Sequence, residues 1–301
     1  MNGNKSDLEN RREFVVTDAQ QGRRLDRALA EADPDRSRSQ IQREIAAKRV
    51  TVDGRIVTQA STRLRADQCI AWTVDDTPDL TPTEIPVSVL YEDDHIVVVD
   101  KPIGMVVHPG AGTTTPTLVE ALLAERDLPQ SDNPVRPGIV HRLDKETSGV
   151  IVVAKTAQAL TSLKQQFAER DVQKAYLAWV DGTFNEDEGE IDAPVTRDPV
   201  RPRRMCVHGT GREARTLFRV LEKTDDRSYV LAQPRTGRTH QIRVHFSYIG
   251  HPVVGDTLYG GPPAERMMLH AWTLSLVHPA TMQRVTFEAS PPEAFPTPPE
   301  R

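Results

Sequence analysis

The chain has few of the residues on which a disulfide framework, a zinc site or a membrane span depends. Its 301 residues include two cysteines, Cys69 and Cys206, whose separation fits neither a disulfide pattern nor a zinc-ligand spacing. No run approaches the roughly 18 apolar residues of a membrane helix, and no N-terminal apolar stretch resembles a signal peptide. We therefore expect a soluble, cytoplasmic protein without a structural metal.

The chain also lacks an excess of positive charge, with 38 basic residues against 43 acidic ones, and aromatic residues make up only 5% of it. The net charge of −5 argues against a protein that binds nucleic acid through its overall charge, so any such surface must be a local patch. The length is compatible with two domains of ordinary size.

One basic patch lies between residues 36 and 65, where eight basic residues stand against two acidic ones. The basic residues are Arg36, Arg38, Arg43, Lys48, Arg49, Arg55, Arg63 and Arg65. Ser39 is a candidate N-cap for a short helix with Ile41 and Ile45 on its buried face.

The same patch continues into two short alternating runs, 50–52 and 56–58, around Asp53-Gly54. This arrangement predicts a tight hairpin. A basic helix followed by a hairpin can lay cations along a phosphate backbone, and a solvated charged face is the alternative interpretation.

The charge changes sign between residues 73 and 94, which hold seven acidic residues, three prolines and neither lysine nor arginine. Such a shift in composition predicts a linker between domains. We therefore expect a flexible arm at 1–20 that ends in a short strand around 13–16, a first domain at 21–76, an acidic linker at 77–86, a second domain at 87–288 and a disordered proline-rich tail at 289–301.

The polar stretch His141-Arg142-Leu143-Asp144-Lys145-Glu146-Thr147-Ser148-Gly149 runs directly into a β-branched segment at 150–154. A rigid strand that follows a polar loop is a typical support for functional side chains. Arg142 and Lys145 flank Asp144, so we expect its carboxylate to stay ionised at neutral pH. These residues alone allow a nucleophile, a general base, an ion-pair anchor or a plain solvated turn.

Periodicity predicts helices at 117–126 and 157–170 and strands at 95–100, 174–180, 272–277 and 283–288. The arginine-rich residues 197–215 contain prolines and glycines and should form a surface loop or hairpin. The stretch 235–245 predicts a turn that feeds a helix, with Ile242, Phe246 and Ile249 facing inward.

Residues 22–72 resemble the small RNA-binding module named after ribosomal protein S-four, through the stretches 23–29, 37–41 and 50–54. Such modules usually carry a glycine where Arg49 stands, so the turn before the hairpin is open to question here.

Three further stretches, His141–Gly149, Arg235–His245 and Gly250–Asp256, resemble in wording and order the RluA/RluD family of RNA pseudouridine synthases. The match covers about residues 88–287, and the domain order resembles the RluD branch. The resemblance implies an α+β fold. A small module of helices and a hairpin would precede a catalytic domain built on a mixed, mainly antiparallel sheet flanked by helices.

The family isomerises uridine in RNA to pseudouridine, and its residues map onto this chain position by position. The resemblance implies that Asp144 is the nucleophile, that Arg238 pairs with it and that Tyr176 packs on the target uracil. Arg142 would fill the gap left by the extracted nucleotide. Arg201, Arg203 and Arg204 would contact RNA phosphates, and His141 would be a structural hydrogen-bonding residue.

The module residues expected to contact RNA are Arg36, Arg38, Arg43, Lys48 and Arg55. Large-subunit ribosomal RNA is the favoured substrate and transfer RNA the second choice. The reaction is redox-neutral, so we expect no cofactor and no metal, and we expect a monomer without membrane association.

Two other classes of function compete with this interpretation. A hydrolase would use Ser148, His141 and Asp144, although residues so close in one loop rarely form a triad. A non-catalytic RNA-binding assembly factor would keep the fold and lack the chemistry.

Overall fold

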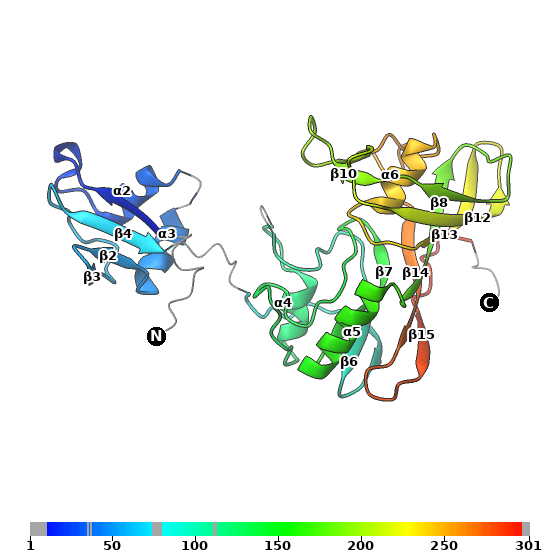
Figure 1. Cartoon of the computed structure of the whole chain (residues 1–301), viewed down its shortest axis with the longest axis horizontal. Helices are drawn as coiled ribbons and strands as arrows, with labels where there is room; N and C mark the ends of the chain where they lie inside the picture. Colours follow the sequence, from blue (N-terminus) through cyan, green and yellow to red (C-terminus); the bar gives the residue numbers. More distant parts are fainter. Residues whose placement is uncertain (1–10, 35, 37, 74–79, 111–112, 297–301) are drawn as a thin grey trace. The chain divides into compact units, whose positions relative to one another are not determined.

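The structure is a computed structural model that describes residues 11–34, 36, 38–73, 80–110 and 113–296, apart from the side chains of Ser39, Gln40 and Arg43. The chain divides into two compact units, residues 1–77 and 78–301, which are described separately below (Figure 1). Three predicted segments are therefore only partly described. Residues 1–10 of the arm, 77–79 of the linker and 297–301 of the tail lie outside the described parts, as does the Arg43 side chain.

The N-terminal unit is a four-stranded antiparallel sheet packed against two helices. Its strands, in spatial order, are β1 (Arg11–Val15), β4 (Cys69–Thr73), β2 (Val50–Val52) and β3 (Arg55–Ile56). Helices α2 (Leu25–Ala32) and α3 (Arg38–Ala46) bury Leu25, Leu29, Ile41 and Ile45 in one apolar core. The predicted inward face of α3 is confirmed. The helix begins at Arg38, so Ser39 lies inside it and the predicted N-cap is wrong.

The predicted hairpin is present between β2 and β3. Val52 pairs with Arg55, and Asp53 and Gly54 both have positive φ, at 51° and 75°, as a two-residue type I′ turn requires. The turn before the hairpin places its positive φ on Lys48, at 63°, one residue before Arg49. Lys48 therefore takes a left-handed conformation that favours glycine, and Arg49, where such modules usually carry glycine, does not.

Residues 11–20 contain the short strand expected near 13–16, and they are ordered instead of forming a flexible arm. β1 pairs with β4 along five residues, and Val16 is fully buried in the core of the unit. The short 3-10 helix η1 (Asp18–Gln20) follows, closed at its start by reciprocal bonds between Thr17 and Gln20. A polar strand at the edge of a sheet gives a weak sequence signal because only one of its faces is covered.

The C-terminal unit is built on a nine-stranded sheet, mixed but mainly antiparallel, as expected. Its main path runs β5 (Ser88–Glu92), β6 (Ile96–Lys101), β7 (Ser148–Ala154), β14 (Leu269–Val277), β8 (Gln173–Asp181), β13 (Arg227–Pro234), β12 (Arg215–Lys223) and β9 (Glu188–Asp192). β15 (Arg284–Glu288) pairs with β14, and among the described strands only β7 and β14 pair in parallel. A separate two-stranded hairpin joins β10 (Val195–Arg197) and β11 (Met205–Val207).

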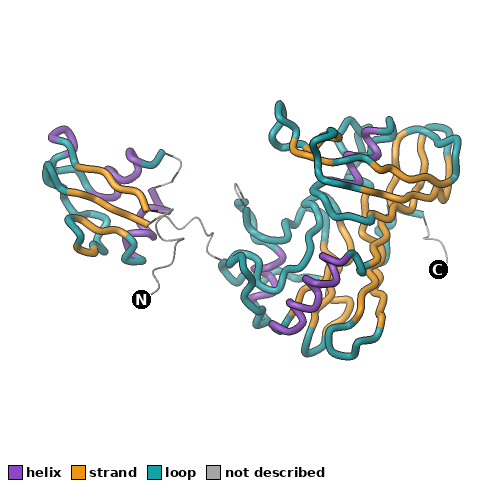
Figure 2. The backbone as a smooth tube through the Cα atoms, viewed as in Figure 1, coloured by secondary structure: helices purple, strands orange, loops and turns teal. Residues whose placement is uncertain are grey.

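Three helices accompany this sheet: α4 (Leu118–Leu123), α5 (Ala157–Glu169) and α6 (Gln241–Tyr248). Strands and loops make up most of the unit (Figure 2). The predicted starts of the first two helices are explained by Thr117, which forms a capping box with Glu120, and Thr156, whose hydroxyl accepts from the Ala159 N–H. Across the described residues, every helix is too short or too polar to cross a membrane.

The predicted linker and tail are each partly ordered on the C-terminal unit. Leu80 packs against the apolar core, and the Thr83 N–H donates to the Glu120 carbonyl at 3.0 Å. The described part of 77–86 is therefore bound to the C-terminal unit beside α4. At the other end, Ala289 and Phe295 are buried, and Phe295 packs beside Tyr229 and Trp272. The prediction of disorder for 289–296 is therefore wrong, because one aromatic residue anchors a segment that is otherwise rich in proline.

Asp26, on α2, is a buried carboxylate that ties the two helices of the N-terminal unit together. Its oxygens accept hydrogen bonds from Arg24, from Arg38 at 2.7 Å and from Gln42 at 2.8 Å. Burial alone would raise the pKa of Asp26, but the hydrogen bonds from Arg24, Gln42 and Arg38 hold it well below its usual range.

We predict that Asp26→Asn lowers the stability of the N-terminal unit by about 2 kcal/mol at pH 7, because charge-assisted hydrogen bonds are removed. A carboxylate with a lowered pKa stabilises the fold above its unfolded pKa of about 4, and this contribution is lost as the pH falls. The difference between the proteins should therefore shrink in acid. Hydrogen exchange of the unit's amides, corrected for intrinsic rates, measures it. The exposed Asp18→Asn is the matched control and should change nothing. A pH-independent difference would contradict the prediction.

Candidate active site

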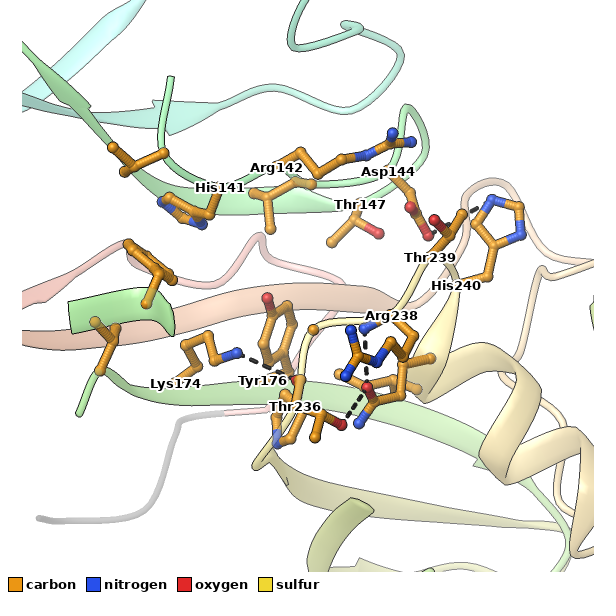
Figure 3. A pocket seen from close by; sticks show the side chains of 18 of the residues that line it. His141, Arg142, Asp144, Thr147, Lys174, Tyr176, Thr236, Arg238, Thr239 and His240 are labelled. Carbon is orange, nitrogen blue, oxygen red and sulfur yellow. Dashed lines mark hydrogen bonds and ion pairs between the residues drawn. The ribbon is translucent and has the colours of Figure 1, made fainter. Parts of the chain in front are cut away.

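A cavity of about 510 Å³ opens in the C-terminal unit where three segments meet (Figure 3). Its walls come from the loop at 141–147, from the start of β8 and from the segment 234–243 that leads into α6. The residues predicted to be catalytic, Asp144, Tyr176 and Arg238, all line this cavity, together with Arg142. The structure thus brings together side chains that are up to about a hundred residues apart in the sequence.

The loop that carries Asp144 is held from beneath by Lys101. This side chain is fully buried, and its ammonium donates to the carbonyls of Pro102, Met105 and Lys145. The Gly104 N–H donates to the Lys145 carbonyl as well, at 2.8 Å. Burial lowers the pKa of the Lys101 ammonium to about 8, with the charge of Asp144 acting in the opposite direction.

Gly149 fixes the other end of the loop, where the chain enters β7. Its φ is +116°, and a Cβ atom at this position would lie 2.2 Å from the Ala271 carbonyl oxygen on β14. Only glycine permits both the backbone conformation and this close approach of two strands. The glycine in the motif therefore has a local physical reason.

Asp144 pairs with Arg243, on α6, and this corrects the prediction that Arg238 is its partner. Arg243 Nη1 donates to Asp144 Oδ2 at 3.1 Å. The same guanidinium also donates to both oxygens of the buried Asp256, at 2.6 and 2.9 Å. Burial alone would lower the pKa of Arg243, but the hydrogen bonds and charges of Asp256 and Asp144 raise it further above its usual value.

Arg238 lies in the cavity wall but is turned toward the protein. Its Nε donates to the Glu213 carbonyl, and its backbone N–H donates to the Gln241 side chain, both at 3.0 Å. Both arginines occur in the same motif, so composition could not separate them. The signal that could have done so is secondary structure, because Arg238 precedes α6 whereas Arg243 lies within it, between two buried neighbours.

Lys174 and Tyr176 occupy alternate positions on β8 and face the cavity together (Figure 3). Burial and the nearby charge of Asp144 raise the pKa of Tyr176, so the ring is present as a neutral phenol. Lys174 donates to the Thr236 carbonyl at 3.3 Å, and burial lowers its pKa to about 8. Among the described residues, no carboxylate pairs with Lys174, so its charge is open to an anionic ligand. Its functional potential was not recognised from the sequence.

His141 is structural, as expected. Its Nε2 accepts from the Val152 N–H at 3.0 Å, its ring stacks on Phe167, and burial lowers its pKa to about 3. Ser148 is buried and bonded to His270 at 2.9 Å instead of to His141. A triad of Ser148, His141 and Asp144 therefore does not form, and the hydrolase alternative is wrong.

Helix α6 connects the arginine-rich hairpin to the cavity. Its first residues line the cavity, and the helix contacts β11 of the hairpin. Arg201 and Arg203 are exposed in the connection between β10 and β11, and Arg204 is partly buried with its guanidinium 5.0 Å from the centre of the Tyr259 ring. Arg142 is exposed at the cavity rim, on the same loop as Asp144.

The five module residues expected to contact RNA have different surroundings. Lys48 and Arg55 are exposed. Arg38 is half-exposed and bonded to Asp26, whereas Arg36 is buried to 8% exposure and paired with Asp33 and Glu44. Arg36 is therefore committed to ion pairs within the unit. Arg43 cannot be assigned, because its side chain lies outside the described parts.

No group of three or more histidine, cysteine, aspartate or glutamate side chains in the described parts is arranged to hold a metal ion. The cavity itself combines one carboxylate with several cations and a phenol, a set suited to an anionic substrate.

Comparison with known proteins identifies the class. The family model described as RNA pseudouridylate synthase matches residues 95–248, and the model of the S4 domain matches residues 23–68. An uncharacterised RNA pseudouridine synthase of Aquifex aeolicus is 43% identical over 90% of this chain and 91% of its own. The ribosomal large subunit pseudouridine synthase D of Nitrosomonas europaea is 42% identical over 95% of this chain and 86% of its own.

Among solved structures, human RNA pseudouridylate synthase domain containing 1 is similar, with a TM-score of 0.56 and 33% identity, covering 70% of this chain and 84% of its own. The chain therefore belongs to the RluA/RluD family of RNA pseudouridine synthases and carries an S4 domain at its N-terminus. It is an isomerase that acts on RNA.

The corrected pairing gives a matched test. We predict that Arg243→Lys lowers the rate of pseudouridine formation roughly 100-fold. The lysine ammonium cannot bond both oxygens of Asp256 and also Oδ2 of Asp144, as the guanidinium does. Arg238→Lys, the same change on the other cavity arginine, should cost less than about tenfold. Tritium release from uridine labelled at carbon five measures both rates, with the melting temperature as a check on folding. The reverse order of effects would restore Arg238 as the partner of Asp144.

Proposed function

We propose that this enzyme isomerises specific uridines of large-subunit ribosomal RNA, with Asp144 as the nucleophile. The observation that supports this best is the ion-pair chain from Asp144 to Arg243 to Asp256, placed in a cavity that also presents Tyr176. A carboxylate that is fixed by a buried cation and faces an open cavity is suited to attack on a bound substrate.

The two oxygens of Asp144 have different surroundings. Oδ2 accepts from Arg243, whereas no described residue donates to Oδ1. The free oxygen is therefore the one we assign to the attack on the target nucleotide. The covalent step divides one difficult rearrangement into two easier ones, after which the base is rejoined to the ribose through carbon five.

Tyr176 supplies a flat neutral surface on the β8 side of the cavity. A phenol with a raised pKa is a poor anionic base near neutral pH, so we assign Tyr176 to packing on the uracil and to hydrogen bonding through its hydroxyl. Lys174, beside it, presents a cation to the nucleotide's phosphate or carbonyl oxygens.

Access to a paired uridine requires that the nucleotide leave its helix, which costs a few kcal/mol. Arg142 is exposed at the cavity rim, where its guanidinium can stack on the bases that remain or hold a phosphate. Arg201 and Arg203 extend from the hairpin, and we assign them to the RNA backbone.

The choice of large-subunit ribosomal RNA rests on relatives. Several proteins around 40% identical over most of the chain are named ribosomal large subunit pseudouridine synthase D. In this chain the S4 domain precedes the synthase domain, which is the domain order that resembles the RluD branch.

The role of Asp144 is tested by Asp144→Asn, which keeps the size of the side chain and its contact with Arg243 but removes the nucleophilic charge. We predict a loss of tritium release of at least about 1,000-fold, with the RNA dissociation constant unchanged within about threefold. Wild-type protein is assayed in parallel on large-subunit ribosomal RNA and on transfer RNA. Equal rates for the two proteins would refute the nucleophile, whereas release from transfer RNA alone would refute the substrate.

The role of the N-terminal unit is tested by Lys48→Gln combined with Arg55→Gln in the full chain. We predict that the slope of log K against log salt becomes shallower by about one for each phosphate that the glutamine side chains no longer neutralise. The rate at saturating RNA should stay the same, because the catalytic cavity is built entirely from the C-terminal unit. An unchanged slope would show that these two cations do not bind RNA.

A further inference from the structure

Tyr259 lies between the Asp144–Arg243 pair and the arginine-rich hairpin. Its side chain is buried and packs in a small cluster with Val195 on β10 and Val244 on α6. The guanidinium groups of Arg243 and Arg204 each lie 5.0 Å from the centre of its ring. One aromatic ring therefore contacts both the partner of the nucleophile and a residue of the hairpin.

The hydroxyl of Tyr259 makes a second connection between the same two regions. It accepts a hydrogen bond from the Met205 N–H, at the start of β11, at 2.8 Å. It also lies 2.8 Å from His240 Nδ1. The Tyr259 carbonyl accepts from Ser247 on α6, so the backbone of this tyrosine is fixed as well.

The hydrogen-bond pattern determines which nitrogen of His240 carries the proton. Burial lowers the pKa of His240 and raises the pKa of Tyr259, so both side chains are neutral near pH 7. The Tyr259 oxygen already accepts from Met205, and among the described residues His240 Nδ1 is the acceptor within reach of its proton. We assign the remaining proton to Nε2 of His240.

His240 Nε2 faces the nucleophile, 3.9 Å from Asp144 Oδ2, the oxygen that Arg243 also holds (Figure 3). The distance is too long for a hydrogen bond in this structure. His240 has a left-handed backbone, with φ at 55°, a conformation that is strained for a residue other than glycine. Its placement therefore depends on contacts such as the one with Tyr259.

The turn of the hairpin that supplies Met205 is closed by its own hydrogen bonds. Asp198 Oδ1 accepts from the N–H groups of Val200 and Arg201, and the Asp198 N–H donates to the Arg204 carbonyl. Arg201 and Arg203 project from this closed turn and are exposed. The exposed arginines are thus joined to the backbone of Met205 by one short turn that is closed by hydrogen bonds.

We propose that Tyr259 is a positioning residue that couples RNA contact at the β10–β11 hairpin to the orientation of His240 and Asp144. This rests on the proposed function, because it takes Asp144 as the nucleophile and the hairpin arginines as RNA contacts. RNA that engages the hairpin holds Met205, Met205 holds the Tyr259 hydroxyl, and the hydroxyl directs His240 Nε2–H at Asp144. RNA that reaches the cavity without the hairpin contact is then modified slowly.

Tyr259→Phe tests the hydroxyl, because it keeps the ring beneath both arginines. Single-turnover tritium release at saturating enzyme should fall about tenfold, with the RNA dissociation constant unchanged. The RNA is whichever of large-subunit ribosomal RNA and transfer RNA the wild-type enzyme modifies. Tyr229→Phe is the matched control, since it removes a buried hydroxyl that bonds Pro296 in another cluster, and its rate should equal that of wild type.

A double-mutant cycle separates coupling from a general structural effect. Arg203→Ala should lower the single-turnover rate about threefold in the wild-type background and leave it unchanged in the Tyr259→Phe background. If the two effects multiply, if Tyr259→Phe weakens RNA binding without changing the rate, or if it changes neither, the proposal is overturned. Asp144→Asn is scored separately, so a failure of the nucleophile assignment would appear there and not in the cycle.

Should Tyr259→Phe melt more than about 10 °C below wild type, His240→Gln combined with Arg203→Ala gives the same test. Glutamine keeps a donor side chain but loses the imidazole geometry, so the effect of Arg203→Ala should again disappear. A threefold loss that persists in the His240→Gln background would overturn the coupling.

Discussion

The structure of the active site depends on a single buried guanidinium. Arg243 is 6% exposed, and removing a full charge from water costs several kcal/mol unless carboxylates compensate it closely. Asp256 supplies most of that compensation through two short hydrogen bonds, which leaves Arg243 with one nitrogen for Asp144. Asp256 thus fixes the guanidinium, and the guanidinium fixes Asp144. Because one carboxylate is dedicated to holding the cation, the other can remain only singly bonded and open to the cavity.

The sheet provides the rigid frame that this pair needs. β7 and β14 approach so closely at Gly149 and Ala271 that the loop before β7 has little freedom at that end. On the other side, the buried Lys101 ammonium donates to the Lys145 carbonyl of the loop and to the carbonyls of Pro102 and Met105, which joins the loop to the segment after β6. Burying the Lys101 ammonium opposes folding, and its hydrogen bonds fix the backbone of the loop at Lys145. Such an arrangement is expected where the geometry of a site matters more than the free energy of folding.

Much of the architecture follows from the sequence by simple rules. The hairpin at Asp53-Gly54, the buried face of α3, the starts of α4 and α5 and the position of Asp144 at the entry to β7 all come from local signals. Local signals fail where a contact distant in the sequence decides the outcome. Phe295, for example, is ordered by packing against Tyr229 and Trp272, which are far from it in the sequence.

The choice between Arg238 and Arg243 shows the same limit inside the site. Both belong to one motif, and only the three-dimensional course of the chain directs Arg238 to Glu213 and Arg243 to Asp144. Sequence spacing also does not reveal the contacts of His240, Tyr259, Lys174 and Asp256, because it does not show which side chains meet in the folded chain. A motif identifies the region of a catalytic site more securely than it assigns each residue its partner.

Charge is distributed in a way that reconciles the acidic chain with a polyanionic substrate. The whole chain carries −5, yet the cavity walls hold one carboxylate, Asp144, among the seven basic residues Arg136, Arg142, Arg170, Lys174, Arg235, Arg238 and Arg243. Several of these cations have their charge partly used by the protein, as Arg243 is by Asp256 and Arg170 by Glu213. Those without a described acidic partner, including Lys174, set a local field that attracts phosphate. These cations attract RNA to the cavity in which Asp144 is exposed, although the chain as a whole is acidic.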